Sequence, residues 1–163
     1  MLKMKCRFQL GLIVILALFV ASLLLSLKAT PDMQPFFALK RVQENLFLEF
    51  KSDPEKKVDY MSNILNSRLE ELQSVVKNEN YDHVLKASLR YSTLAGRITE
   101  IVVDNNLTDK IDRVKDQFLS HQKLLDALYV AYPKNIPDNE EHKYIQDDYN
   151  YLNLYLDQLE KVK

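Results

Sequence analysis

The chain has 163 residues, with 22 basic and 23 acidic side chains and a formal net charge of −1. The two signs are mixed along the sequence, which excludes the clustered basic face that nucleic-acid binding requires. The single cysteine, Cys6, excludes a fold held by internal disulfides, so the body of the chain must be stabilised by a hydrophobic core.

The first element in the chain is an apolar segment, residues 10–27, that contains no charged side chain. At ~1.5 Å per residue it would form a helix of about 27 Å, close to the ~30 Å hydrocarbon core of a bilayer. Three basic residues precede the segment and Lys28 alone follows it, which predicts a cytosolic amino terminus. We therefore expect a cytosolic stub (residues 1–9), a single-pass signal anchor (residues 10–27), a linker (residues 28–34) and a helical domain outside the cytosol (residues 35–163).

A cleaved secretory leader is the alternative for the same segment. Such leaders have a shorter apolar core, about 7–15 residues, followed by small residues at the cleavage site. The nearest candidate site here ends at Ala29, with the bulky Leu27 two positions earlier. Both the length of the segment and the residues that follow it favour an uncleaved anchor, and a cleaved leader is the alternative.

The remainder of the chain shows the helical period. Apolar residues recur three and four positions apart, and no convincing alternating strand pattern competes with them. The expected helices are Pro35–Phe50, Pro54–Lys77, Tyr81–Val103, Thr108–Tyr132 and Asp138–Val162. Asp53 is expected to cap the second of these, with proline at its first position, and Thr108 to cap the fourth.

Turn residues separate these helices at short connections, including Asn78–Asn80, Asp104–Asn106 and Pro133–Pro137. Short connections between long amphipathic helices favour antiparallel neighbours. The expected fold is all-α: one transmembrane helix followed by an up-and-down bundle of about four long helices. The shorter helix before them would pack on the bundle or continue the membrane helix. In the third helix, Gly96 would permit a close approach by a neighbouring helix.

No motif for metal, cofactor or catalysis is found. The three histidines, His83, His121 and His142, lack a second histidine three or four residues away. The segment from Asp104 resembles a calcium loop, but Asp109 stands where glycine is required and Lys115 where glutamate is required. Phosphate-binding loops and nucleophile turns are absent, and the acidic pairs on the helices are typical of a solvated face. We expect no metal, no cofactor and no enzymatic activity.

Tyrosine is the one unusual enrichment, with nine in the chain and four in the last predicted helix. Tyr144, Tyr151 and Tyr155 form a stripe at steps of seven and four residues. The simpler interpretation is bundle packing with the hydroxyl groups reaching water. The alternative is an interaction surface for a partner, because tyrosine is enriched at protein interfaces.

The stretch from Pro35 to Leu72 resembles an uncharacterised bacterial family, a domain of unknown function whose members follow one membrane or signal segment. The resemblance rests on Pro35, Leu39-Lys40-Arg41, Glu44, Asp53-Pro54-Glu55-Lys56-Lys57-Val58 and Arg68-Leu69-Glu70-Glu71-Leu72. The family has alanine where this chain has Val58 and Asn66, and the resemblance fades beyond Gly96. It implies an exported, membrane-tethered, all-helical domain with no assigned activity, so no functional residue is carried over.

These observations predict a non-enzymatic helical domain tethered to the outer face of the cytoplasmic membrane, acting as a scaffold or protein-interaction module. The alternative is a ligand-sensing bundle, by analogy of fold alone. The predicted cytosolic stub is too short to hold an output domain, so a sensor would require a separate signalling partner. The partners expected are therefore the membrane and an unidentified protein, not nucleic acid.

Overall fold

The computed structural model describes Ala21, residues 53–134 and residues 139–162. The chain divides into two compact units, Met1–Phe50 and Lys51–Lys163. In the first unit only Ala21, an exposed helical residue, is described. The predicted anchor (residues 10–27), the linker (residues 28–34) and the helix Pro35–Phe50 lie outside the described residues. Within the described part, no helix is both long and apolar enough to span a bilayer.

Four long helices and one short turn of 3-10 helix make up the second unit as far as it is described. They are α3 (Pro54–Lys77), the 3-10 helix η1 (Tyr81–His83), α4 (Val84–Asp104), α5 (Thr108–Ala131) and α6 (His142–Glu160). The expectation of an all-helical domain with four long helices is confirmed for these residues.

The start of α3 follows the local rules for a capped helix. Asp53 has extended backbone angles, and its carboxylate accepts a hydrogen bond of 3.1 Å from the Glu55 amide. Pro54 stands at the first helical position, where its missing N–H costs nothing. Glu55 then places a negative charge at the positive end of the helix dipole. The predicted cap is therefore confirmed.

A tight reversal joins α3 to α4 and depends on a residue with positive φ. Glu79 adopts φ 59°, in the left-handed region that glycine usually occupies. The Asn80 amide donates to the Val75 carbonyl at 3.0 Å, and the Glu79 amide donates to the Val76 carbonyl at 3.1 Å. These two bonds satisfy carbonyl groups that the end of α3 would otherwise leave unpaired.

The connection from α4 to α5 repeats this geometry. Asn106 adopts φ 50°, and the Leu107 amide donates to the Val102 carbonyl at 3.0 Å. Thr108 is the first residue of α5 and not its cap, which corrects the expectation from the sequence. The cap position falls on Leu107, whose side chain cannot accept a hydrogen bond, because the reversal ends one residue earlier than a threonine cap would need.

The last helix begins later than predicted, at His142 and not at Asp138. Asn139 explains the part of this difference that the structure describes. Its side-chain oxygen accepts hydrogen bonds from the Glu141 amide at 3.0 Å and from the Tyr132 hydroxyl at 2.7 Å. These bonds fix residues 139–141 as a turn against the end of α5, and the helix starts only after that turn.

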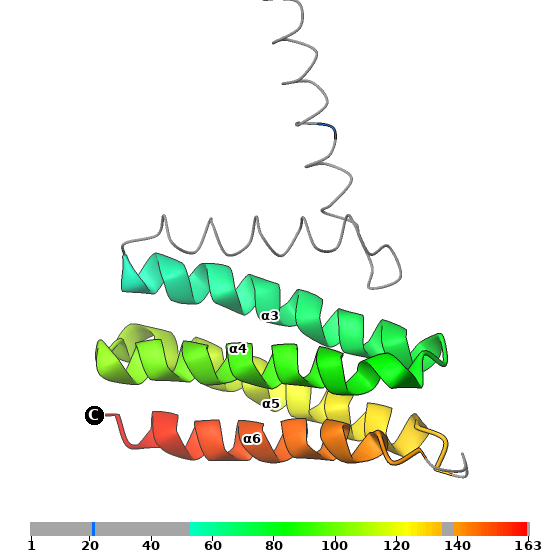
Figure 1. Ribbon diagram of the computed structural model, residues 1–163. Coiled ribbons are helices and arrows are strands. Elements are labelled where there is room, and N and C mark those ends of the chain that lie inside the picture. Colours follow the sequence, from blue (N-terminus) through cyan, green and yellow to red (C-terminus); the bar gives the residue numbers. More distant parts are fainter. Residues whose placement is uncertain (1–20, 22–52, 135–138, 163) are drawn as a thin grey trace, which may run out of the picture. The chain divides into compact units, whose positions relative to one another are not determined.

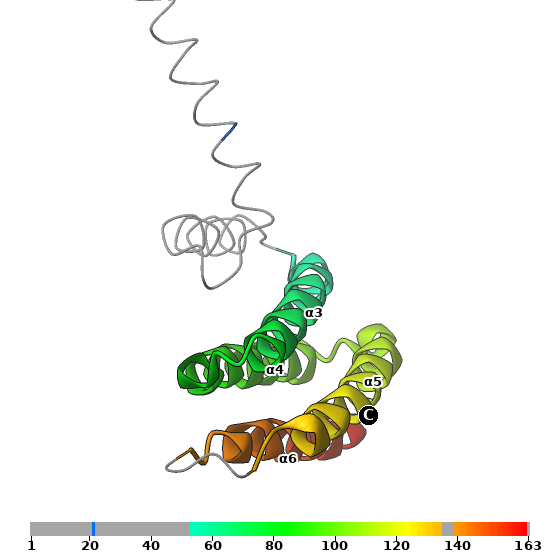
Figure 2. The ribbon, with the colours of Figure 1, turned by 90° about the vertical axis from the view of Figure 1, so that its right-hand side faces the viewer.

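The four helices form two helical hairpins. Hairpin A consists of α3 and α4 and hairpin B of α5 and α6, and each is an antiparallel pair (Figure 1). The hairpins stack mainly through α4 and α6, which run in the same direction, while α3 and α5 meet along a lesser contact (Figure 2). Helix α5 therefore follows α4 in the chain but packs little against it. The expected antiparallel neighbours are found within each hairpin but not across the α4–α5 connection.

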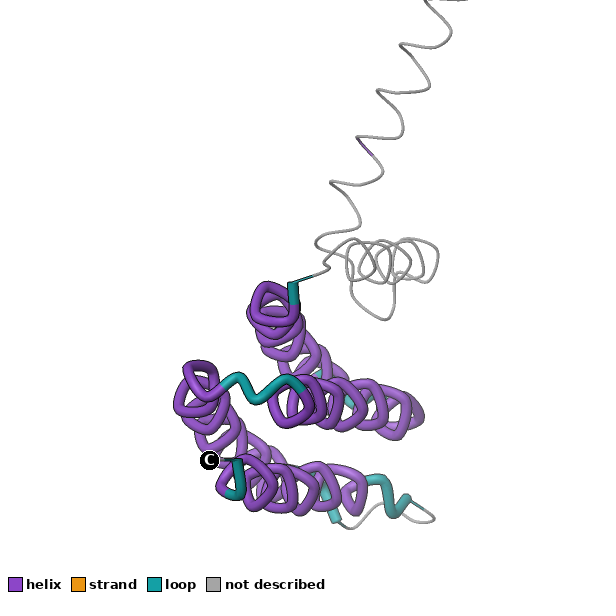
Figure 3. The backbone as a smooth tube through the Cα atoms, turned by 90° about the vertical axis from the view of Figure 1, so that its left-hand side faces the viewer, coloured by secondary structure: helices purple, strands orange, loops and turns teal. Residues whose placement is uncertain are grey.

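Figure 3 shows the two hairpins stacked on one another. The core residues lie on their inner faces. The predicted apolar stripes supply most of this core. Fully buried large side chains include Met61, Leu65, Leu72, Tyr91, Ile98, Phe118, Leu125, Ile145, Leu152 and Leu159. Close packing of side chains of this size accounts for the stability of a cysteine-free domain.

Candidate functional site

An acidic side chain is buried where the two hairpins meet. Asp148 lies on α6 and is 1% exposed, in line with the apolar residues Ile145 and Leu152. Neither of its carboxyl oxygens has a hydrogen-bond partner. The hydroxyls of Ser88 and Ser92 come close from α4, but both already donate elsewhere. Ser88 Oγ donates to the Tyr144 carbonyl at 3.2 Å, and Ser92 Oγ donates to the Ser88 carbonyl at 3.0 Å.

Burial keeps this carboxyl protonated. Desolvation raises the pKa of Asp148 from 3.8 to about 8, because a charged carboxylate is poorly stabilised away from water. The hydroxyls of Ser88 and Ser92 oppose the shift, and the negative charge of Asp147 adds to it. At neutral pH the group is therefore mainly the uncharged acid, which can donate one hydrogen bond.

A chain of polar side chains crosses the interior beside Asp148. The Tyr91 hydroxyl lies 3.0 Å from His121 Nδ1, and His121 Nε2 lies 2.9 Å from the Asn66 side-chain oxygen. Burial lowers the pKa of His121 to about 4, so its ring is neutral near pH 7. Burial, with a contribution from the charge of Asp148, raises the pKa of Tyr91. Three helices, α3, α4 and α5, thus share one uncharged hydrogen-bonded chain.

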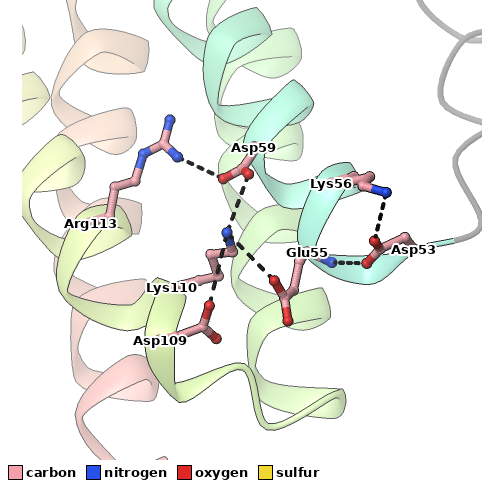
Figure 4. Close-up of polar contacts among 7 residues, drawn as sticks. All are labelled: Asp53, Glu55, Lys56, Asp59, Asp109, Lys110 and Arg113. Atoms are coloured by element: carbon pink, nitrogen blue, oxygen red, sulfur yellow. Dashed lines mark hydrogen bonds and ion pairs between the residues drawn. The ribbon is translucent and has the colours of Figure 1, made fainter.

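These hydrogen bonds continue into a row of polar contacts between α3 and α5, which we call the α3–α5 ladder. Gln117 donates from α5 to the Ser62 carbonyl at 2.8 Å and to Asn66 at 2.6 Å. Asp59 pairs with Arg113 at 2.7 Å and with Lys110 at 3.2 Å (Figure 4). The hairpins are therefore joined by apolar packing along α4 and α6 and by polar groups along α3 and α5.

A second set of charges stabilises hairpin A internally. Glu71 of α3 pairs with Arg68 at 3.2 Å and also with Arg90 of α4. Glu71 and Arg68 are each 7% exposed. Buried charges of this kind are tolerated only when paired, so the cluster fixes how α3 and α4 align.

The three tyrosines of the predicted stripe lie in different environments. Tyr155 packs against Phe118, with ring centroids 6.4 Å apart, and its hydroxyl donates to the Ser92 carbonyl at 3.4 Å. Tyr151 stacks on Tyr155 at 6.2 Å but is 47% exposed. Tyr144 is partly buried, and its carbonyl accepts the Ser88 bond. Tyr155 therefore contributes to packing between helices, and Tyr151 is the member of the stripe that reaches the surface.

The residues at the start of α6 contact the start of α4 in hairpin A. The Glu141 carboxylate accepts a hydrogen bond of 3.2 Å from the Leu85 amide, in the first turn of α4. The His142 ring contacts the rings of Tyr129 and Tyr132, with a centroid distance of 5.9 Å to each. Because His83 offers α4 no side-chain cap, Glu141 supplies this acceptor from the other hairpin.

An open cleft of about 760 Å³ lies beside this end of the molecule. It is lined by Lys134, Asn139, Glu140, Glu141, His142, Lys143, Tyr144 and Asp147. Its walls carry charges of both signs. Among the described residues, no group of three or more histidine, cysteine or acidic side chains is arranged to hold a metal ion.

Asp148, His121 and Asn66 were not singled out as a site from the sequence. The feature of the sequence that could have identified them is a polar residue at a position where the helical period predicts an apolar one. Asp148, at helical spacing between Ile145 and Leu152, is an example. That pattern predicts burial, but it does not reveal which groups on other helices come close.

Comparison with protein-family models identifies a domain of unknown function, DUF5667, over residues 28–135. The chain belongs to this family. The match includes α3, α4 and α5 and ends before α6 begins, so Asp148 and the three tyrosines lie beyond it. No curated protein and no solved structure matches the chain.

Proposed function

We propose that this chain is a non-enzymatic helical scaffold or protein-interaction module, tethered to the outer face of the cytoplasmic membrane. The tether is the apolar segment at residues 10–27, with basic residues on its amino-terminal side. The interaction role is supported by the stacked hairpins, which present long helical surfaces to solvent. The membrane and one unidentified protein are the partners proposed, and no cofactor is required.

The observation that carries the interaction role is the exposed edge of α6. Tyr151 is 47% exposed and Leu154, one turn further on, is 51% exposed. Tyrosine offers a large contact area with few rotatable bonds, which lowers the entropy lost on binding. The buried side chains of Tyr91, His121 and Asn66 are hydrogen-bonded to one another, so they serve helix packing. Of the predicted surface of Tyr144, Tyr151 and Tyr155, we propose that Tyr151 makes the main contact.

Site-specific photocrosslinking tests this role. A photoreactive phenylalanine analogue at position 151 should yield a discrete crosslinked protein in intact cells. The same analogue at Asp157, which is also exposed on α6, is the matched control and should yield none. Equal yields from the two positions would contradict a partner surface at Tyr151.

Protease treatment of intact cells tests the location. The helical domain should be digested from outside while a cytosolic marker stays intact. Digestion only after the cells are opened would invert the topology. A catalytic activity of the purified chain that is lost on changing one polar cluster, such as Asp148 with His121, would contradict the non-enzymatic role.

A ligand-sensing bundle is the second candidate, and the cleft at the start of α6 is what favours it. The cleft has the volume of a small-molecule site and offers both carboxylates and lysines. A ligand bound there would raise the melting temperature by mass action. A thermal-shift screen of charged metabolites separates the two functions, because a scaffold has no such ligand. The variant Lys143→Ala should abolish any shift that arises from the cleft.

A further inference from the structure

The α4–α6 contact contains a carboxyl group that becomes costly when it ionises. Asp148 is 1% exposed, and both of its oxygens lack a hydrogen-bond donor. The nearest hydroxyls, those of Ser88 and Ser92, are engaged with main-chain carbonyls. A negative charge placed there would be offset only in part by the hydroxyls of Ser88 and Ser92. Full hydration of the carboxylate requires α6 to move away from α4.

The charged and titratable groups that face Asp148 do not offset such a charge. On its own helix the neighbouring charge is Asp147, of the same sign, and Tyr155 is a neutral phenol. Helix α4 presents Tyr91, also a neutral phenol. Helix α5 contributes His121, which is bonded to Tyr91 and neutral at pH 7. Helix α3 contributes the side-chain amide of Asn66, which is hydrogen-bonded to His121 and carries no charge.

We propose that ionisation of Asp148 separates α6 from α4, so that the stacking of the two hairpins is controlled by the pH of the surrounding medium. The α3–α5 ladder does not depend on this carboxyl and would hold the other edge of the hairpins together. Its ion pairs involve Asp59 with Lys110 and Arg113. The molecule would therefore open along one edge and not unfold as a whole. This property belongs to the described helices and does not depend on the membrane location or the scaffold role.

The raised pKa of Asp148, about 8, sets the upper end of the pH range over which the opening varies. In the open form the carboxyl would titrate near its ordinary pKa of 3.8. Between these two values the closed form holds one proton more than the open form. The opening constant should therefore rise about tenfold per pH unit up to pH 8 and level off above it.

Hydrogen–deuterium exchange on the full chain, purified in mild detergent, measures this opening. The amides of α6 should lose protection about tenfold per pH unit between pH 6 and 8, after correction for the intrinsic exchange rate. The amides of α3 should change much less. In Asp148→Asn the protection of α6 should be independent of pH over the same range. Asp147→Asn, which neutralises the adjacent but exposed carboxylate, should retain most of the pH dependence.

Three results would overturn the proposal. The first is protection of α6 that does not change with pH in the unmodified chain, a result that needs no variant. The second is an equal loss of protection in α3, which would show unfolding of the whole unit. The third is a pH dependence that persists when Asp148 is replaced. If the asparagine variant does not fold, Asp148→Leu provides the same test, because it removes the titrating group and matches the apolar surroundings.

Discussion

Replacing Gly96 by alanine tests whether Tyr155 fixes the spacing of α4 and α6. An added Cβ at this position would lie 2.8 Å from the Tyr155 hydroxyl oxygen and 3.1 Å from ring atom Cζ. Both distances are shorter than ordinary van der Waals contacts, so the ring would have to move by several tenths of an ångström. The ring has little freedom, because Phe118 and Tyr151 pack against it and its hydroxyl bonds to Ser92.

Two opposing effects set the size of the stability change caused by Gly96→Ala. Alanine in place of glycine within a helix stabilises it by about 1 kcal/mol. Forcing extra volume into a packed contact costs about 1–3 kcal/mol. Gly96→Ala should therefore leave the stability unchanged or lower it by up to about 2 kcal/mol. In a Tyr155→Leu background the ring is gone, and the same change should stabilise the chain by about 1 kcal/mol.

Urea unfolding, followed by far-UV circular dichroism, measures this double-mutant cycle. The four proteins are the unmodified chain, Gly96→Ala, Tyr155→Leu and the double variant. We expect an interaction energy of about 1–3 kcal/mol between the two positions. Thr93→Ala, an exposed change on the same helix, is the matched control, and its effect should be the same in both backgrounds. If Gly96→Ala stabilises the unmodified chain as much as it stabilises the Tyr155→Leu variant, the tyrosine ring does not lie against α4 and the reasoning fails.

Three further predictions concern the turns, the helix cap and the titrating groups. Glu79→Gly should raise the stability by about 1 kcal/mol in urea unfolding, because glycine adopts φ 59° without strain; a loss of stability would contradict this. Glu141→Ala should lower it by about 1 kcal/mol through loss of the acceptor for α4, whereas Glu140→Ala, at an exposed position, should change it by only a few tenths. Equal effects would exclude the cross-hairpin cap. The stability measured by guanidinium unfolding should vary little between pH 4 and 6.5. In this range two contributions to the pH dependence of stability oppose each other. Asp148, with its raised pKa of about 8, lowers the stability as the pH rises, and His121, with its lowered pKa of about 4, raises it. Stability should then fall by about 1.4 kcal/mol per pH unit towards pH 8, because native Asp148 still holds a proton that the unfolded chain has already lost. Asp148→Asn should instead lose stability only on acidification below pH 6.5, where the unfolded histidine gains a proton, and a parallel pH profile would refute this assignment.

The helices and many of their ends can be predicted from residues that are neighbours in the chain. Asp53-Pro54 begins α3, and Asn78 and Asn105 mark the reversals after α3 and α4, because caps and turns depend on residues next to one another in the chain. Apolar residues at helical spacing, such as Met61, Leu65 and Leu72 of α3, are buried, since a period of 3.6 residues defines which face of a helix turns inwards. Three helix starts differ from the prediction: α4 begins at Val84 after a turn of 3-10 helix, Thr108 is the first residue of α5 and not its cap, and α6 begins at His142. In the last case the side chain of Asn139 fixes a turn before the helix.

Which helices pack together, and which groups they bury, depends on contacts between residues that are distant in the chain. A helical stripe states that a face is buried but does not name the helix that covers it, so the pairing of α4 with α6 could not be inferred. For the same reason the stripe of tyrosines did not reveal that Tyr155 lies against Gly96 while Tyr151 stays exposed. The raised pKa of Asp148 has the same origin: a carboxyl group loses its water only when other helices close around it, and residues distant in the chain bring those helices together.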